Sequence, residues 1–489
     1  MERKRLMILE NIIKDCGVVS IHGSGAIGIS SIESDSRKCI RDSLFVAVKG
    51  FSSDGHGFIG KAIDGGACAI LCEELPAEME SDVTYVQVKD SRHALAIAAS
   101  NFYGRPSEKL SLVGITGTNG KTTTVTLLYN LFTSLGYSCG LLSTIANYVG
   151  VKRYETANTT SDPVTINRLL AEMADAGCEY CFMEVSSIGM EQHRTDGLSF
   201  RIGIFSNLTH DHLDYHKTFA EYLRCKKLFF DNLPETAAAI VNKDDRNSSV
   251  MVQNTRAKVV TYAVKSLADH TARVMEESFD GMQLRIDGRE VWTGLIGRHN
   301  ASNILACYTA AVQLGADSDE VLLAVSRLQA ASGRLETLRG PKELCVIIDY
   351  AHTPDALENV LSTLKEVSCG RKLICLFGCG GDRDRTKRPE MAAVAEKYAD
   401  SIFVTSDNSR TEDPEAIIED IRKGFSAKGS ARVIAITNRR EAIRTAILTA
   451  PAGAAILLAG KGHETYQDVM GKKSHFDERE IVKEVFEAL

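Results

Sequence analysis

Residues 114–123 read Gly-Ile-Thr-Gly-Thr-Asn-Gly-Lys-Thr-Thr, a glycine-rich turn between two largely apolar runs. The apolar run before it predicts a buried strand, and KTTTVTLLYNLFTSLG after it predicts a helix. Glycines in such a turn let backbone N–H groups and the helix N-terminus face a phosphate. Lys121 can then reach the terminal phosphates, and Thr122 or Thr123 can place a hydroxyl on Mg²⁺. The stretch predicts a nucleoside triphosphate site, although Ile115 replaces the first glycine of the strict P-loop pattern.

The same strand, turn and helix alternation extends along most of the chain. Strand-like runs include SLFVAV, ACAILC and TYVQV before the turn, CEYCFMEV and RIGIFSNL after it, and CVIID, KLICLFG, SIFVTSD, ARVIAIT and AAILLAG near the end. Continuous apolar strands alternating with helices predict an α/β fold with mostly parallel sheets covered on both faces. A chain of 489 residues exceeds one core, so we expect three domains at 1–109, 110–336 and 337–489.

Composition narrows the class of protein. The net charge of −7 argues against a nucleic-acid partner, which needs clustered Lys and Arg. The first residues, MERKRLMILENIIKD, lack the apolar core of a signal peptide, and no run of 18 apolar residues predicts a membrane span. The 13 cysteines are scattered through apolar runs, which is typical of a reducing compartment. We therefore expect a cytoplasmic enzyme with no membrane partner.

Polar clusters follow two further predicted strands. Glu184, in MEVSS, stands where a strand ends, and its carboxylate suits Mg²⁺. The stretch 207–216 holds three histidines, but no cysteine accompanies them, and Mg²⁺ is the expected ion in nucleotide chemistry. Lys226, in EYLRCKKLFF, has by itself the pattern of a surface lysine on an amphipathic helix.

Six motifs taken together resemble the Mur ligases, ATP-dependent enzymes that form amide bonds in peptidoglycan precursor synthesis. They are GTNGKTT (117–123), MEVSS (183–187), SNLTHDHLDYH (206–216), GRHNASN (297–303), GRLE (333–336) and DYAHTPD (349–355). The resemblance covers nearly the whole chain. It implies a small α/β uridine-nucleotide domain, a central P-loop-like ATPase domain and a Rossmann-like C-terminal domain.

The resemblance implies an ATP site and two magnesium sites. The expected ATP-binding residues are Gly117, Thr118, Asn119, Gly120, Lys121, Thr122, Thr123, Asn300, Asn303, Arg334 and Asp349. The expected catalytic residues are Lys121, Glu184, His212 and Lys226. Thr122 and Glu184 would hold one Mg²⁺, and His212 and a carbamylated Lys226 the other. A carbamate turns the cationic lysine into an anionic oxygen ligand.

The N-terminal motifs DSR (35–37), SLFVAVKG (43–50) and DGHGFI (54–59) resemble the branch of the family that adds the third residue of the peptide. The implied nucleotide substrate is UDP-N-acetylmuramoyl-L-alanyl-D-glutamate. Its expected binding residues are Ser36, Phe51, Ser52, Ser53, Asn158, Thr159, Thr160, Ser186, Gln192 and Arg194. Ile188 departs from the histidine that often follows the two serines.

The added amino acid is expected to be meso-diaminopimelate. Its second carboxylate suits the guanidinium of Arg410, a residue that lysine-adding enzymes lack. The implied binding residues are Arg383, Asp407, Asn408, Arg410, Gly460 and Glu464; Ser409 departs from the usual proline. The reaction would pass through an acyl phosphate, on a monomer.

Alternatives remain. They are an L-lysine-adding enzyme, a folate or cyanophycin type ligase, a P-loop ATPase and a non-catalytic nucleotide-binding module.

Overall fold

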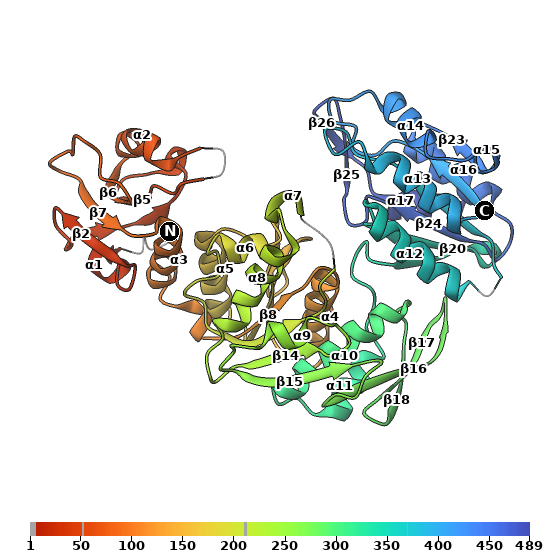
Figure 1. Ribbon diagram of the computed structural model, residues 1–489, viewed down its shortest axis with the longest axis horizontal. Coiled ribbons are helices and arrows are strands. Elements are labelled where there is room, and N and C mark those ends of the chain that lie inside the picture. The colour runs from red at the N-terminus through yellow and green to blue at the C-terminus, as the bar shows by residue number, and fades with distance from the viewer. Residues whose placement is uncertain (1–5, 51–52, 210–212, 369) are drawn as a thin grey trace. The chain divides into compact units, whose positions relative to one another are not determined.

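The computed structural model describes residues 6–50, 53–209, 213–368 and 370–489 (Figure 1). It divides into two compact units, Met1–His270 with Ala306–Val321 and Thr271–Leu305 with Leu322–Leu489. The first unit contains two large sheets and the second a third, so the predicted α/β class is confirmed. The domain boundaries expected after residues 109 and 336 stay a prediction. Among the described residues, no helix combines the length and apolar character needed to cross a bilayer.

The N-terminal sheet has the strand order β2-β7-β6-β5-β4. Strands β4 to β7 are parallel and β2 is antiparallel at the edge. The α3 helix begins beside Asp90, whose carboxylate accepts from the N–H groups of Arg92 and His93. The elements are β1 (Met7–Ile8), α1 (Leu9–Ile12), β2 (Val18–His22), β3 (Gly28–Ile29), β4 (Ser31–Glu33), β5 (Ser43–Val46), α2 (Ile59–Asp64), β6 (Ala67–Cys72), β7 (Thr84–Val88) and α3 (Ser91–Phe102).

The second sheet of the first unit runs in the order β11-β10-β9-β12-β8-β13-β14-β15. Six of these strands are parallel, and β10 and β11 form an antiparallel edge. Its elements are β8 (Ser111–Thr116), α4 (Lys121–Ser134), β9 (Cys139–Leu142), β10 (Asn147–Val149), β11 (Lys152–Tyr154), α5 (Pro163–Asp175), β12 (Tyr180–Glu184), α6 (Ser187–Glu191), β13 (Phe200–Phe205), α7 (Leu213–His216), α8 (Phe219–Asp231), β14 (Ala238–Asn242), α9 (Ser248–Met251) and β15 (Lys258–Ala263).

Close packing places α8 directly over β8. A Cβ built on Gly114 would lie 2.6 Å from Phe229 and 2.7 Å from Phe200, so a larger residue would push the helix off the strand. Lys226 is three residues before Phe229 and therefore shares its inward face. The apolar packing of α8 thus carries Lys226 toward the end of β8.

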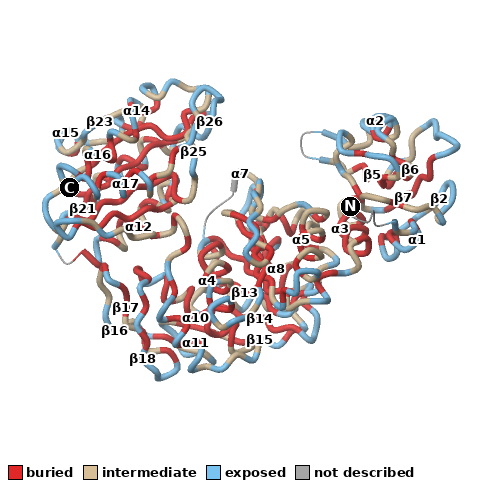
Figure 2. Tube along the Cα trace, turned by 180° about the vertical axis from the view of Figure 1, so that it is seen from behind, coloured by how far each residue is buried: buried red, intermediate tan, exposed pale blue. Residues whose placement is uncertain are grey.

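The second unit contains a Rossmann-like sheet in the order β19-β20-β24-β21-β22-β23, parallel except for β19. Its core lies along these strands, which are mostly buried in Figure 2. The elements from β19 on are β19 (Glu336–Arg339), β20 (Cys345–Asp349), α12 (Pro354–Val367), β21 (Leu373–Phe377), α13 (Lys387–Tyr398), β22 (Ser401–Val404), α14 (Pro414–Arg422), α15 (Ala427–Ser430), β23 (Val433–Ala435), α16 (Arg439–Thr449), β24 (Ala455–Ala459), β25 (Tyr466–Val469), β26 (Lys472–His475) and α17 (Glu478–Glu487).

An antiparallel meander departs from the expected strand–helix alternation. It consists of β16 (His270–Ser278), β17 (Gly281–Ile286) and β18 (Arg289–Thr293). Asp-Gly pairs stand at both hairpin turns, at 280–281 and 287–288, and their glycines have positive φ. The helices α10 (Arg298–Gln313) and α11 (Ser318–Val325) follow.

Candidate active site

The predicted phosphate turn links β8 to α4. Its two glycines take positive φ, +151° at Gly117 and +88° at Gly120. A Cβ on Gly117 would lie 2.0 Å from the hydroxyl oxygen of Ser206. Only glycine therefore fits at this position without moving its neighbours. The close contact of Gly117 with Ser206 shows that residues at the end of β13 pack directly against the backbone of the turn.

The end of β13 supplies that support. The Thr118 N–H donates to the Asn207 carbonyl at 2.8 Å, and the Asn119 N–H donates to the Asn207 side-chain oxygen at 3.0 Å. The Ser206 hydroxyl donates back to the Asn119 carbonyl at 2.7 Å. Because β8 and β13 are adjacent parallel strands, their carboxyl ends meet and this network follows from the sheet order.

Two lysines converge on the Gly117 carbonyl. The Lys121 ammonium donates to the carbonyls of Gly117 and Thr118, both at 2.8 Å. The Lys226 ammonium donates to the same Gly117 oxygen at 2.8 Å and lies over the Tyr222 ring. Lys226 is buried, so the surface position suggested by its helical pattern is wrong. The role that the family motif implied for it, a carbamylated magnesium ligand, stays a prediction.

Glu184 is buried at the end of β12, next to the turn. One of its carboxylate oxygens accepts from the Thr122 hydroxyl at 3.0 Å, and the other accepts from the Thr144 N–H at 2.8 Å. A carboxylate and a hydroxyl together form an oxygen donor set that fits Mg²⁺. Thr144 was not anticipated, because it lies in a short loop without a motif.

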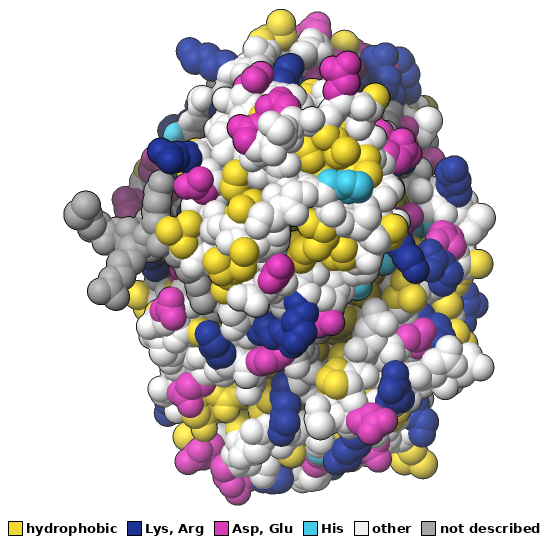
Figure 3. Space-filling view, turned by 90° about the vertical axis from the view of Figure 1, so that its left-hand side faces the viewer, with side chains coloured by type: hydrophobic (Ala, Val, Ile, Leu, Met, Phe, Trp, Pro, Cys, Tyr) yellow, Lys and Arg dark blue, Asp and Glu magenta, His cyan; other side chains and the backbone are white. Residues whose placement is uncertain are grey.

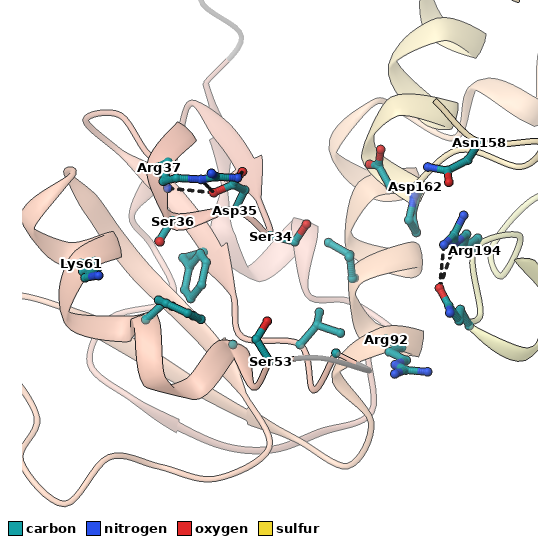
Figure 4. A pocket seen from close by; sticks show the side chains of 18 residues that line it. Ser34, Asp35, Ser36, Arg37, Ser53, Lys61, Arg92, Asn158, Asp162 and Arg194 are labelled. Atoms are coloured by element: carbon teal, nitrogen blue, oxygen red, sulfur yellow. Dashed lines mark hydrogen bonds and ion pairs between the residues drawn. The ribbon is translucent and has the colours of Figure 1, made fainter. Parts of the chain in front are cut away.

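Five of the expected uridine-nucleotide residues line a cavity of about 580 Å³ in the first unit. Ser36 and Ser53 lie on one side of it, and Asn158 and Arg194 lie across from them (Figure 4). Gln192 completes the predicted residues in the wall. The sequence had also placed Phe51 and Ser52 here, and both lie outside the described residues, as does His212 of the second magnesium set.

Arg194 ties this cavity to the catalytic strand. Its guanidinium donates to the Thr160 carbonyl at 2.6 Å and to the Gln192 side-chain oxygen at 2.7 Å. The Thr160 hydroxyl donates to the Glu184 carbonyl at 2.9 Å and accepts from the Ser186 N–H at 3.0 Å. Thr159 accepts a hydrogen bond from Thr144 at 3.1 Å. Three of the predicted residues thus lie between the cavity and Glu184 rather than in the cavity wall.

The remaining ATP residues lie in the second unit. The Asp349 carboxylate accepts from the N–H groups of Leu335 and Ala351 at 2.8 and 2.9 Å, and burial raises its pKa. The Arg334 guanidinium lies over the Tyr350 ring at 5.1 Å, and within the described part of the chain its buried Nε has no hydrogen-bond partner. Such an orphaned donor is suited to a ligand oxygen.

The two expected adenine-side residues lie on the first turns of α10, and both are buried. The Asn300 amide donates to the Ile296 carbonyl at 2.8 Å, and the Asn303 amide donates to the Asn300 side-chain oxygen at 2.9 Å. In this arrangement the two side chains hold each other in place.

The predicted amino-acid site is a buried polar cluster at the carboxyl ends of β22 and β24. The Asn408 amide donates to Glu464 at 2.9 Å. Gly460 has φ +114°, and a Cβ there would lie 2.7 Å from the Asp407 carboxylate. Burial alone would raise the pKa of Asp407, but Lys461, Arg439 and the Asn408 N–H lower it overall.

The side chains of Arg410 and Arg383 differ in how firmly their surroundings fix them. Arg410 has positive φ, +49°, and its guanidinium donates to the Gly381 carbonyl at 2.6 Å. Arg383 is exposed and bonds to the carbonyl of Asp382. Ser409, in place of the family's proline, is buried, and its hydroxyl has no partner among the described residues. A proline there would leave no such polar atom to satisfy.

Lys461 is the residue at this cluster that the sequence reasoning missed. It is fully buried, and its ammonium donates to Asn408 at 3.2 Å and to Glu464 at 3.1 Å. The available signal was its place in GKGHE, where a lysine between two glycines stands directly after the apolar run AILLAG. A strand end followed by such a residue favours an inward position.

Comparisons with known proteins agree with this geometry. The chain matches three family models, Mur ligase family, catalytic domain (28–103), Mur ligase middle domain (115–311) and Mur ligase, glutamate ligase domain (333–462). A UDP-N-acetylmuramoyl-L-alanyl-D-glutamate–2,6-diaminopimelate ligase from Cytophaga hutchinsonii is 50% identical, over 99% of this chain and 100% of that protein.

Solved structures are similar over the same length. A structure of a UDP-N-acetylmuramoyl-L-alanyl-D-glutamate–2,6-diaminopimelate ligase is 31% identical with a TM-score of 0.73, over 99% of both chains. The MurF ligase of Thermotoga maritima in complex with ADP is 19% identical with a TM-score of 0.60, over 94% of this chain and 97% of that one, and shows the fold alone. With family segments from residue 28 to 462 and a half-identical relative of matching length, this chain belongs to the Mur ligase family.

Proposed function

We propose that the protein is an ATP-dependent, ADP-forming ligase that joins meso-diaminopimelate to the D-glutamate γ-carboxylate of UDP-N-acetylmuramoyl-L-alanyl-D-glutamate. The observation that carries the proposal is the contact of buried Lys226 with the phosphate turn, 2.8 Å from the Gly117 carbonyl. The resemblance to the Mur ligases implies a carbamylated lysine at this position, which a plain P-loop ATPase does not require. Family membership and the shared name of full-length relatives support the same reaction.

In the first step a γ-carboxylate oxygen attacks the γ-phosphorus of ATP, and the bond to the bridging oxygen of ADP breaks. The Lys121 ammonium is hydrogen-bonded to the turn and is well placed to stabilise the negative charge that develops on the phosphoryl oxygens. Thr122 and Glu184 would hold one Mg²⁺, and Lys226 as a carbamate, with His212, the other. Bound Mg²⁺ supplies positive charge against the phosphates.

In the second step the amine of diaminopimelate attacks the acyl carbon. The tetrahedral intermediate expels phosphate, the amine loses a proton, and an amide bond remains. Water would hydrolyse the acyl phosphate, so the substrates must be held in a dry site. The cavity wall contributes by orienting the nucleotide substrate, with Gln192 and Arg194 linked by hydrogen bonds on one side of it.

Selection of the amino acid is assigned to the Asp407–Glu464 cluster. Arg410 offers a guanidinium to the distal carboxylate, and its positive φ and its bond to Gly381 fix its direction. Asp407 and Glu464 are suited to the distal ammonium, with Asn408 and Gly460 shaping the site. The exposed guanidinium of Arg383 is suited to the other carboxylate. Lysine lacks the distal carboxylate and leaves Arg410 without a partner.

The test offers diaminopimelate and L-lysine in parallel to the full chain with ATP, Mg²⁺ and the nucleotide dipeptide, and measures both ADP and tripeptide product. We expect product with diaminopimelate and little with lysine. Arg410→Ala should lower kcat/KM for diaminopimelate by about a hundredfold or more, because it removes the charge-assisted hydrogen bonds between the guanidinium and the distal carboxylate. Arg444→Ala, an exposed arginine on α16, is the matched control.

Two outcomes contradict the proposal. ADP release at full rate without the dipeptide and amine would indicate an ATPase, and equal use of both amines would remove the specificity. We further propose that residues 1–109 bind the nucleotide substrate, residues 110–336 bind ATP and residues 337–489 bind the amino acid, and that the protein is a monomer. We also propose a cytoplasmic location, because ATP and the nucleotide precursor are cytoplasmic metabolites.

A further inference from the structure

Two imidazoles and a carboxylate converge beside the nucleotide cavity, outside the residues used above. His93 Nδ1 lies 2.7 Å from Asp196 Oδ2, and His193 Nδ1 lies 2.8 Å from the same oxygen. The three ligand atoms lie within 4.8 Å of one another. Because the carboxylate oxygen can only accept, both rings carry their proton on Nδ1 in this arrangement.

The group joins two separate elements of the first unit. His93 lies in the first turn of α3, whereas His193 and Asp196 lie in the turn that follows α6. His193 has a positive φ, +56°. Asp196 is the most buried of the three side chains, at 15% exposure, and the histidines are about 40% exposed. The site is thus anchored on its carboxylate and open on its imidazole side.

A second carboxylate stands behind one ring. Asp90 Oδ2 lies 3.7 Å from His193 Nε2, the nitrogen opposite the one that faces Asp196. Metal-binding histidines commonly donate this other N–H to a carboxylate, which fixes the ring and its tautomer. Asp90 is itself held by the N–H groups of Arg92 and His93 as the cap of α3.

The group is also accessible. His93 and Asp196 line a cavity of about 690 Å³ that is distinct from the nucleotide cavity, together with residues such as Phe229 and Arg256. Space on this side leaves room for water to complete the coordination of an ion. On the face of the molecule drawn in Figure 3, acidic, basic and hydrophobic side chains are interspersed.

We propose that His93, His193 and Asp196 bind a divalent transition-metal ion, with Zn²⁺ the best fit. Two imidazole nitrogens and one carboxylate oxygen suit zinc, and water would take the fourth position. Binding requires each neutral imidazole to move its one proton from Nδ1 to Nε2, so that both Nδ1 lone pairs face the ion. Mg²⁺, which prefers an all-oxygen shell, does not compete for this site.

Binding has a consequence for the neighbouring cavity. Arg92 lies beside His93, and Gln192 and Arg194 lie on either side of His193; all three line the nucleotide cavity. An ion bridging α3 and the turn after α6 would fasten these two parts of the wall together. A bound ion would therefore be expected to change the affinity of the cavity for the nucleotide substrate. This effect does not depend on which reaction the enzyme catalyses.

The test titrates the EDTA-treated full chain with CoCl₂ in excess MgCl₂, and then displaces Co²⁺ with ZnCl₂. We expect one equivalent of Co²⁺ with a visible absorption band and no thiolate band. His93→Gln, His193→Gln and Asp196→Asn should each weaken binding by at least about a hundredfold, since even outer-shell changes cost 10–100-fold. His22→Gln, an exposed histidine on β2, is the matched control.

Two further measurements separate metal binding from folding. The variants should keep the melting temperature of the unmodified chain in EDTA and lose its rise with ZnCl₂. His93→Cys retains a ligand and should keep Co²⁺ while gaining a thiolate-to-cobalt band. Identical titrations for the unmodified chain and the three variants would overturn the proposal, as would the absence of Co²⁺ binding to the unmodified chain. In either case the group is an ion-paired contact between the two elements.

Discussion

Gly117→Ala tests the idea that the phosphate turn is held from the side by the end of β13. An alanine Cβ would lie 2.0 Å from the Ser206 hydroxyl and 3.0 Å from the Asn207 carbonyl. The atoms must separate by about 1.4 Å to reach an ordinary contact near 3.4 Å. Moving the Ser206 hydroxyl that far breaks its 2.7 Å hydrogen bond to the Asn119 carbonyl, and the tighter contact with Asn207 strains the two hydrogen bonds that Asn207 accepts from the turn.

The magnitude follows from these contacts. Overpacking costs about 1–3 kcal/mol, and each lost hydrogen bond costs about 0.5–1.5 kcal/mol. A total near 3 kcal/mol corresponds to roughly a hundredfold weaker ATP binding, at about 1.4 kcal/mol per tenfold. Gly136→Ala is the matched control, because Gly136 also has positive φ, +96°, but a Cβ there meets nothing within 4 Å. It should cost about 1 kcal/mol of stability and leave ATP binding unchanged.

The assay is calorimetric titration of each variant with ATP and Mg²⁺, together with its thermal midpoint. Adding Ser206→Gly to Gly117→Ala removes the shortest contact and should recover part of the lost affinity, a coupling of about 1 kcal/mol or more. Gly117→Ala that binds ATP within twofold of the unmodified protein would refute the reasoning. So would a double variant with no recovery.

Three further predictions rest on buried charges. Lys226→Arg keeps a cation at the turn but cannot be carbamylated; kcat should fall by about a hundredfold or more while ATP affinity, measured by titration, changes little. Arg439→Met leaves Glu478 buried without its 2.8 Å partner and should cost about 3–5 kcal/mol in urea unfolding, and Glu478→Leu added to it should recover most of the loss. Asp407 has a folded pKa below its ordinary 3.8, so its carboxylate contributes stability that is lost as the pH falls through that lower pKa; Asp407→Asn should flatten the acid side of a pH–stability curve.

Local pattern predicted the parts of the site whose positions follow from adjacent elements. The turn 114–123 contains its own strand, glycines and helix start, so its shape follows from sequence. The ends of β12 and β13 meet it because parallel neighbours share an edge, which brings Glu184 and Asn207 to Thr122 and Thr118.

Position along a helix predicted less, because the face that is buried depends on what covers it. Lys226 lies on α8 among both apolar and charged residues. The amphipathic pattern of the helix was therefore equally consistent with a solvent-exposed lysine. Its burial results from the contact of Phe229 with Gly114, two residues that are 115 apart in the chain. Lys461 was missed for a related reason: its partners Asn408 and Glu464 follow β22 and β24, two parallel strands that end at the same edge of the sheet on either side of β21.

Glycine links these observations. At Gly114 the missing Cβ lets α8 approach β8, at Gly117 it lets β13 grip the turn, and at Gly460 it admits the Asp407 carboxylate. Each glycine allows one charged side chain to approach the backbone: Gly114 allows Lys226, Gly117 allows Lys121, and Gly460 allows Asp407. A larger side chain at the glycine would block that approach. Lys121 and Lys226 share the Gly117 carbonyl, so substitution at Gly114 or Gly117 should disturb the phosphate turn and leave Asp407 in place, whereas substitution at Gly460 should disturb Asp407. Independent losses at the phosphate turn and at the amino-acid cluster are therefore expected from Gly117→Ala and Gly460→Ala, with the second leaving ATP titration unchanged.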